Sequence, residues 1–266
     1  MNKHASAIVL LVFLASSTAF ADSPSRVVSL DYCADQFVLK LLPREKILAL
    51  SKDAERDFSY MRKSAKGIPQ VRPVAENILA LQPDLIVRSY GGGAQALGFF
   101  ERVGVPVVQL PYANTVNDIR SNIVEVATSL GVPNQGKAVQ AQMDKRLAAI
   151  RTAATGSSTL YMTPTGVTSG TGTLVHEMLL AAGRTNFEKR RGWHALPLER
   201  LAFERPTQVA AAFFTQTTNH PALWSAMRHP VAKRQISELP TVMLQGSWTA
   251  CGGWFLIDAI EALAAP

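Results

Sequence analysis

The stretch AENILALQPDLIV, residues 75–87, decides the fold class of this chain. It joins a short apolar helix to a buried strand through a proline, a residue that a helix does not tolerate in its interior. Nearly the same pattern returns in LERLAFERPTQVAAAFF, residues 198–214. In both copies an acid stands seven residues before the proline, as Glu76 or Glu199. The repetition predicts two lobes of similar construction, each presenting one of these acids.

Strand-like and helix-like runs alternate around both copies, without hairpin turns between them. This alternation is typical of mainly parallel sheets flanked by helices, and it predicts the α/β class. In the first half we expect strands at residues 26–30, 46–50, 84–89 and 106–110, helices at 37–42 and 94–104, and a loop at 31–36. In the second half we expect a strand at 159–163, a glycine-rich loop at 164–172, a helix at 174–183 and a linker at 184–197. After the repeat we expect a helix at 220–228, a strand at 241–245, a loop at 246–253 and a helix at 254–263.

Two further helices lie between the halves. The first spans residues 115–130, and the second begins at Asn134 and has no strand partner, which favours a single long connecting helix. We therefore expect an N-terminal lobe at 22–133, a connecting helix at 134–155 and a C-terminal lobe at 156–266.

The first 21 residues have the organisation of a cleavable export signal. Lys3 precedes an apolar run from residue 5 to 14, and small residues lead to Ala21. The run is short for a membrane span, although an uncleaved anchor is the alternative. Without Lys3 the mature chain carries 26 Lys and Arg against 20 Asp and Glu, with no basic stripe interleaved with aromatic residues, which argues against nucleic-acid binding. We expect a soluble exported protein.

Motifs of familiar enzymes and metal sites are missing from the sequence. It contains no P-loop, no G-x-S-x-G elbow and no dinucleotide fingerprint, and HEMLL at 176–180 lacks the second histidine of a zinc protease. The mature first lobe has no histidine at all, which argues against a binding protein for bare zinc or manganese. We predict no catalytic residue, no cofactor and no resident metal, with an exported enzyme that lacks a familiar motif as the alternative.

The chain resembles the periplasmic substrate-binding proteins of metal-chelate ABC importers. The resemblance rests on RVVSLDYCADQFVLKL, AENILALQPDLIV, GVPVVQLP, VTSGTGTLVHEMLLAAGRTNF, LERLAFERPTQVAAAFF and GSWTACGGWFLIDAIEALA, and it covers essentially the whole mature chain. It implies two α/β lobes bridged by one stiff helix, with a corrinoid, ferric siderophore or haem bound between them. It also implies that Glu76 and Glu199 contact arginines of an inner-membrane permease. A monomer is expected.

Residues that follow strands supply the candidate ligand contacts, because parallel sheets bind ligands at the carboxyl ends of their strands. Tyrosine and tryptophan suit a large flat chelate, and arginine can pair with its carboxylates or phosphate. Arg88 is a further cation of this kind. The predicted contacts are Tyr32, Cys33, Arg56, Arg72, Tyr90, Gly91, Gly92, Ser169, Trp193, Trp248 and Cys251.

The two cysteines, Cys33 and Cys251, are expected near the cleft from opposite lobes. They could line the ligand site as thiols, form a disulfide across the cleft, or have no role. Among ligands, a corrinoid is placed slightly ahead of a ferric siderophore, and haem comes third.

Overall fold

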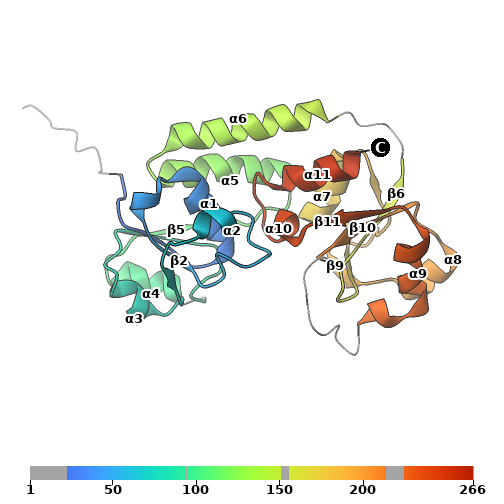
Figure 1. Ribbon diagram of the computed structural model, residues 1–266, viewed down its shortest axis with the longest axis horizontal. Helices are drawn as coiled ribbons and strands as arrows, with labels where there is room; N and C mark the ends of the chain where they lie inside the picture. Colours follow the sequence, from blue (N-terminus) through green and yellow to red (C-terminus); the bar gives the residue numbers. More distant parts are fainter. Residues whose placement is uncertain (1–22, 94, 151–155, 214–224, 266) are drawn as a thin grey trace, which may run out of the picture.

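The structure, a computed structural model, describes residues 23–93, 95–150, 156–213 and 225–265. Two α/β lobes lie beside each other, and helices α5 and α6 run along one side of the molecule (Figure 1). The α/β class with two mainly parallel sheets is confirmed. Within the described ranges, no helix is both long enough and apolar enough to span a membrane. The predicted export signal, residues 1–21, lies outside them.

The N-terminal lobe is built on a five-stranded sheet in the order β3-β2-β1-β4-β5, and all its pairs are parallel. Its strands are β1 (Val27–Ser29), β2 (Ile47–Ser51), β3 (Gln70–Val71), β4 (Leu85–Arg88) and β5 (Val107–Gln109). Its helices are α1 (Tyr32–Leu41), η1 (Arg44–Lys46), α2 (Arg62–Ala65), α3 (Ala75–Leu79) and α4 (Ala96–Arg102).

The C-terminal lobe has a four-stranded parallel sheet in the order β11-β10-β6-β8 and a separate antiparallel pair, β7 and β9. The strands are β6 (Ser158–Met162), β7 (Val167–Ser169), β8 (Thr185–Asn186), β9 (Trp193–Ala195), β10 (Gln208–Ala212) and β11 (Thr241–Leu244). The helices are α7 (Leu174–Ala181), α8 (Leu198–Phe203), η2 (Ala226–Arg228), α9 (Pro230–Glu238), α10 (Gly246–Thr249) and α11 (Leu256–Ala264).

Several sequence-based boundaries are wrong. The expected loop at 31–36 is the start of α1, because the Asp31 side chain accepts from Ala34 N and caps the helix early. The expected loops and linker at 164–172, 184–197 and 246–253 contain β7, β8, β9 and α10, which are too short to produce a periodic pattern. Residues 220–224 of the helix expected near 220–228 lie outside the described ranges, and 226–228 form only a 3-10 turn. Helix α9 was not predicted.

Two long helices occupy the middle of the chain, α5 (Val116–Ser129) and α6 (Pro133–Ala149), and they lie side by side (Figure 1). Thr115 and Asp118 form a capping box at the start of α5. Gly136 allows the pair to approach closely, since a Cβ there would lie 2.4 Å from that of Ala127. Helix α6 leads toward the C-terminal lobe, as expected of a connecting helix, while the domain limits at 133 and 155 stay predictions.

One hydrophobic core runs through both lobes. Its buried residues include Val27 and Phe37 from the first lobe, Ile123 from α5, and Ala210 and Ile260 from the second lobe. Helix α11 and the segment before it bring the lobes together, since the Trp254 ring meets Phe37 edge-on with centroids 5.4 Å apart. Because shared buried surface opposes separation, the lobes are joined by more than the connecting helix.

A polar cluster reinforces this junction. Arg146 on α6 donates 2.6 Å hydrogen bonds to both Asp258 and Glu261 on α11. From the first lobe, the Tyr60 hydroxyl donates to Asp258 over 2.8 Å, and its ring stacks on Phe255 at 4.8 Å. Burial, followed by the bond to Asp258, raises the pKa of Tyr60 to about 12, so the phenol stays protonated. The cluster therefore ties α6, α11 and the first lobe together.

Buried Asp35 on α1 should make stability fall as pH rises. Burial raises its pKa from 3.8 to about 6, although hydrogen bonds from Ser51 N (3.0 Å) and Oγ (2.6 Å) oppose the change. Between these two pH values the folded protein binds more protons than the unfolded chain, so the unfolding free energy decreases with pH, by up to about 3 kcal/mol. We expect Asp35→Asn to flatten this slope in urea melts between pH 4 and 6.5. An undiminished slope in Asp35→Asn would show that another group is responsible.

Candidate ligand-binding cleft

A cavity of about 470 Å³ lies between the lobes. Both lobes contribute apolar side chains, to which the N-terminal lobe adds three tyrosines and two polar residues, and the C-terminal lobe adds Trp193 and Thr249. Among the described residues that line it, none carries a charged side chain. Its lining includes Tyr32, Cys33, Ser89, Tyr90, Gln109, Tyr112, Leu174, Met178, Trp193, Thr249 and Cys251.

The aromatic residues of the cavity are unusually accessible for their size. Tyr90, Tyr112 and Trp193 are 53%, 78% and 51% exposed. Tyr32 is half-buried between two rings, with centroids 5.9 Å from Tyr90 and 4.7 Å from Phe58. Exposed aromatic faces offer a ligand apolar area together with polar groups at their edges. The cavity can therefore cover a broad flat molecule.

Sheet topology places the N-terminal wall. Tyr32 follows β1, Tyr90 follows β4 and Tyr112 follows β5, and these strands are parallel neighbours in the order β1-β4-β5. Their carboxyl ends meet at one edge of the sheet, so the three tyrosines gather there. In the second lobe, Thr249 and Cys251 likewise follow β11.

Tyr32 and Tyr90 are neutral hydrogen-bonding groups at neutral pH. Burial raises the pKa of Tyr32, and the hydrogen bond between Tyr32 and Tyr90 offsets only part of this increase. Burial, and then the neighbouring Tyr32 and Asp31, raises the pKa of Tyr90. Together with Gln109 and Thr249, they give the cavity uncharged donors and acceptors.

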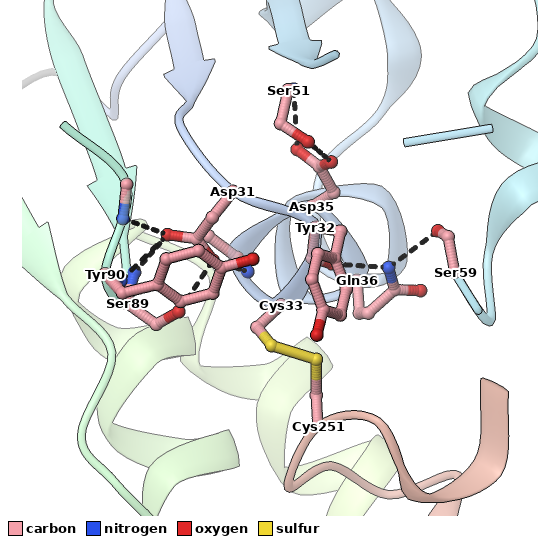
Figure 2. Close-up of a disulfide and its surroundings, with 12 residues drawn as sticks. Asp31, Tyr32, Cys33, Asp35, Gln36, Ser51, Ser59, Ser89, Tyr90 and Cys251 are labelled. Carbon is pink, nitrogen blue, oxygen red and sulfur yellow. Dashed lines mark hydrogen bonds between the residues drawn. A yellow bond between two sulfur atoms is a disulfide. The ribbon is translucent and has the colours of Figure 1, made fainter. Parts of the chain in front are cut away.

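A disulfide between Cys33 and Cys251 joins the two lobes in the cavity wall (Figure 2). It links the first turn of α1 to the segment between α10 and α11, across 218 residues of sequence, with Cα atoms 5.6 Å apart. Of the alternatives left by the sequence, the structure shows the disulfide. Both cysteines lie at the cavity, as expected, and the bond restrains how far the lobes can separate there.

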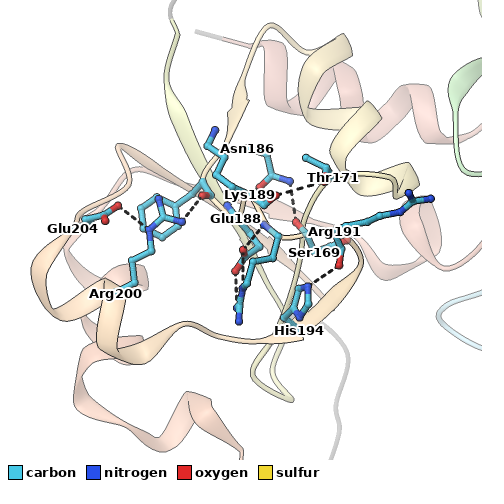
Figure 3. A network of polar contacts seen from close by, with 11 residues as sticks. Ser169, Thr171, Asn186, Glu188, Lys189, Arg191, His194, Arg200 and Glu204 are labelled. Atoms are coloured by element: carbon cyan, nitrogen blue, oxygen red, sulfur yellow. Dashed lines mark hydrogen bonds and ion pairs between the residues drawn. The ribbon is translucent and has the colours of Figure 1, made fainter.

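The chain on both sides of Trp193 belongs to a polar network that includes Glu188, Arg191 and His194 (Figure 3). Strand β9 pairs with β7, with Trp193 opposite Ser169. The loop before it is fixed by buried Glu188, whose carboxylate accepts from Arg190 N at 2.8 Å and from its guanidinium at 2.9 and 3.1 Å. His194 Nε2 lies 2.8 Å from Arg191 O. These contacts fix the backbone on both sides of the indole.

Five of the predicted contacts line the cavity: Tyr32, Cys33, Tyr90, Trp193 and Cys251. The other six lie outside its lining. Arg56 is exposed, 4.0 Å from Asp53, and Arg72 is also exposed. The hydroxyl of buried Ser169 bonds to Thr173, and Trp248 lines a separate hollow of about 220 Å³.

Gly91 and Gly92 are not part of the cavity lining. A Cβ on Gly91 would stand 2.4 Å from Leu30 O, so only glycine lets this loop pass the first strand. The main omission from the sequence-based set is Tyr112. It follows the strand ending at Gln109, and the rule that found Tyr90 would have found it as well.

The paired acids are exposed on the short helices that precede β4 and β10. Glu76 lies in the first turn of α3, and Glu199 in the first turn of α8. Among the described residues, neither has an ion-pair partner. Each lobe therefore presents one member of this pair to solvent.

Solved structures of low sequence identity share this fold. A possible iron-binding protein of Staphylococcus epidermidis has a TM-score of 0.72 and 16% identity, over 91% of this chain and 98% of that one. A periplasmic haem-binding protein of Pseudomonas aeruginosa gives 0.68 and 22%, over 91% and 92%. The vitamin B12-binding protein BtuF of Vibrio cholerae gives 0.66 and 18%, over 91% and 96%. At these identities the likeness concerns the fold.

Sequence comparison identifies the family. The search of curated proteins found no significant match to the chain. Residues 27–236, however, match the family model described as periplasmic binding protein, from strand β1 of the first lobe into helix α9 of the second. The chain therefore belongs to the periplasmic binding protein family.

Proposed function

We propose that this protein captures a metal chelate between its lobes in the periplasm and delivers it to an ABC importer, with a corrinoid as the first candidate. The observation that carries the proposal is the uncharged, aromatic lining of the cavity. An anionic ligand would lose hydration there without gaining a cation, which costs several kcal/mol. A corrinoid such as cyanocobalamin has no net charge, and its amide side chains match the phenols, Ser89, Gln109 and Thr249.

Haem is the second candidate, and a specific observation favours it. The cavity of about 470 Å³ suits a ligand smaller than a corrinoid. A corrinoid would bury one face there and leave the rest of its surface in solvent. Tyr32 and Tyr90 also present phenols in the cavity, and a tyrosine oxygen can ligate haem iron. Against haem stand its propionates, for which the described lining holds no cation. A neutral ferric hydroxamate fits the same charge rule, and an anionic catecholate does not.

Delivery to the importer is assigned to the paired acids. Glu76 and Glu199 are exposed, lie one in each lobe and form no ion pair with any described residue, so a permease with a basic residue above each lobe could recognise both at once. The ligand and the docking points are separate, because neither acid lines the inter-lobe cavity.

Titration of the mature protein with a chelate panel tests this function. We expect cyanocobalamin to quench tryptophan fluorescence saturably, a neutral ferric hydroxamate or haem to bind more weakly, and ferric enterobactin not to bind. Trp193→Ala should weaken binding about 10-fold to 100-fold, because an aromatic contact contributes roughly 1–3 kcal/mol.

Trp248→Ala is the matched control, since that indole lines a different hollow, and its affinity should equal that of the wild type. No response to any chelate in the panel would exclude the proposed function. Equal losses in the two tryptophan variants would exclude this cavity as the site.

A further inference from the structure

A single buried carboxylate organises the N-terminal wall of the cleft. Asp31 is 3% exposed and stands between β1 and α1. Its Oδ1 accepts from Ala34 N at 3.0 Å, which caps α1, and from Ser89 Oγ at 2.6 Å. Its Oδ2 accepts from three successive backbone N–H groups, those of Ser89 (2.7 Å), Tyr90 (3.0 Å) and Gly91 (2.9 Å), as Figure 2 shows in part.

This arrangement is more than helix capping requires. A cap needs one acceptor for Ala34 N, and serine or threonine would supply it. The other four bonds all go to the loop after β4. Three consecutive N–H groups that converge on one oxygen form an anion-binding nest, and here the anion is a side chain of the protein. No described cation forms an ion pair with Asp31, so the loop itself supplies the stabilisation.

The two segments that Asp31 joins both carry cavity residues. Tyr32 is the next residue along α1, and Tyr90 is the central residue of the nest. Their rings meet at a centroid distance of 5.9 Å and an interplanar angle of 70°. Tyr90 is half exposed and its phenol bonds to that of Tyr32, so the position of the Tyr90 backbone decides whether the two rings can meet in this way. We infer that Asp31 is a positioning residue for ligand binding, which sets the place of Tyr90 against Tyr32 through the loop at 89–91.

The inference rests on the proposed function for its effect on affinity, and on the protein alone for its effect on the loop. Asp31→Ser is the informative variant, because serine keeps the helix cap and loses the loop bonds. The matched control is Asp84→Ser. Asp84 also accepts from two backbone N–H groups and a serine hydroxyl, those of Ser25 and Arg26, but stands before the amino end of β4 and outside the cavity lining.

We expect Asp31→Ser to weaken cyanocobalamin binding about tenfold and Asp84→Ser to leave it within twofold. In a Tyr90→Ala background, Asp31→Ser should add less than a twofold loss, since its effect passes through Tyr90. Hydrogen exchange at the amides of residues 89–91 should accelerate in Asp31→Ser and stay unchanged in Asp84→Ser. Additive losses in the double variant, an effect equal to that of Asp84→Ser, or unchanged exchange would each overturn the inference.

Failure of the proposed function has a different signature. If the wild type binds no chelate in the panel, the function is wrong, and the exchange rates alone then decide the role of Asp31. If Asp31→Ser does not fold, Asp31→Asn takes its place. Asparagine retains one acceptor oxygen and puts an amide donor against the remaining N–H groups, so the same loss of protection at 89–91 is expected.

Discussion

Alanine at both Glu76 and Glu199 should abolish chelate import by cells while ligand affinity stays unchanged. Both acids are exposed and lie outside the cavity lining, so their removal leaves the binding site intact. At a permease interface each would be desolvated against a cation, and truncating one partner of such a pair costs about 2–5 kcal/mol. Either single variant should therefore reduce uptake of labelled cyanocobalamin more than tenfold, and the double variant should reduce it to background.

Controls for this experiment come from other exposed acids. Glu101 on α4 and Glu238 on α9 are exposed, one in each lobe, and their replacement by alanine should leave uptake unchanged. Loss of ligand affinity in Glu76→Ala or Glu199→Ala would contradict the docking role, as would normal uptake in the double variant.

Removing the inter-lobe disulfide should have the largest effect on stability. Cys33 and Cys251 are 218 residues apart, so their bond greatly restricts the unfolded chain. We expect the double variant Cys33→Ala/Cys251→Ala to lose about 2–4 kcal/mol of unfolding free energy. For a chain of this length, the loss lowers Tm by roughly 5–15 °C in a thermal melt.

Reduction separates the bond from the substitutions. Dithiothreitol should lower the Tm of the wild type by a similar amount and leave that of the double variant unchanged. Ligand affinity should also fall, because the bond holds the two walls of the cavity together and so reduces the ordering cost of binding. Equal Tm values for wild type and double variant would show that the shared core alone fixes the lobes.

The parts of the fold that could be predicted are those with strong local signals. The helix–proline–strand unit occurs twice, and its apolar runs are long enough to identify β4 and β10 as buried strands. The helix at 115–130 was found within a residue of α5, because Thr115 is a clear cap. By contrast, β7, β8 and β9 have only two or three residues each, and their pairing depends on contacts distant in sequence.

The residues of the site also differ in how far the sequence could predict them. Tyr32 and Tyr90 could be predicted because they directly follow parallel strands, whose carboxyl ends must meet. Arg56 and Arg72 were chosen for their charge, but charge does not determine the direction of a side chain, and both are exposed. The position of both cysteines at the cleft was predictable because each follows a strand, in a strand-to-helix loop of its own lobe. Whether they bond depends on how the second lobe packs against α1, which no local pattern determines.

A co-crystal structure with cyanocobalamin tests most directly whether the uncharged cleft is the ligand site. The account predicts the corrin ring between the lobes, in contact with Tyr90 and Tyr112 on one side and Trp193 on the other, with the Cys33–Cys251 bond intact. A corrinoid bound on another surface, or one held by charged side chains such as Arg56 and Arg72, would contradict it.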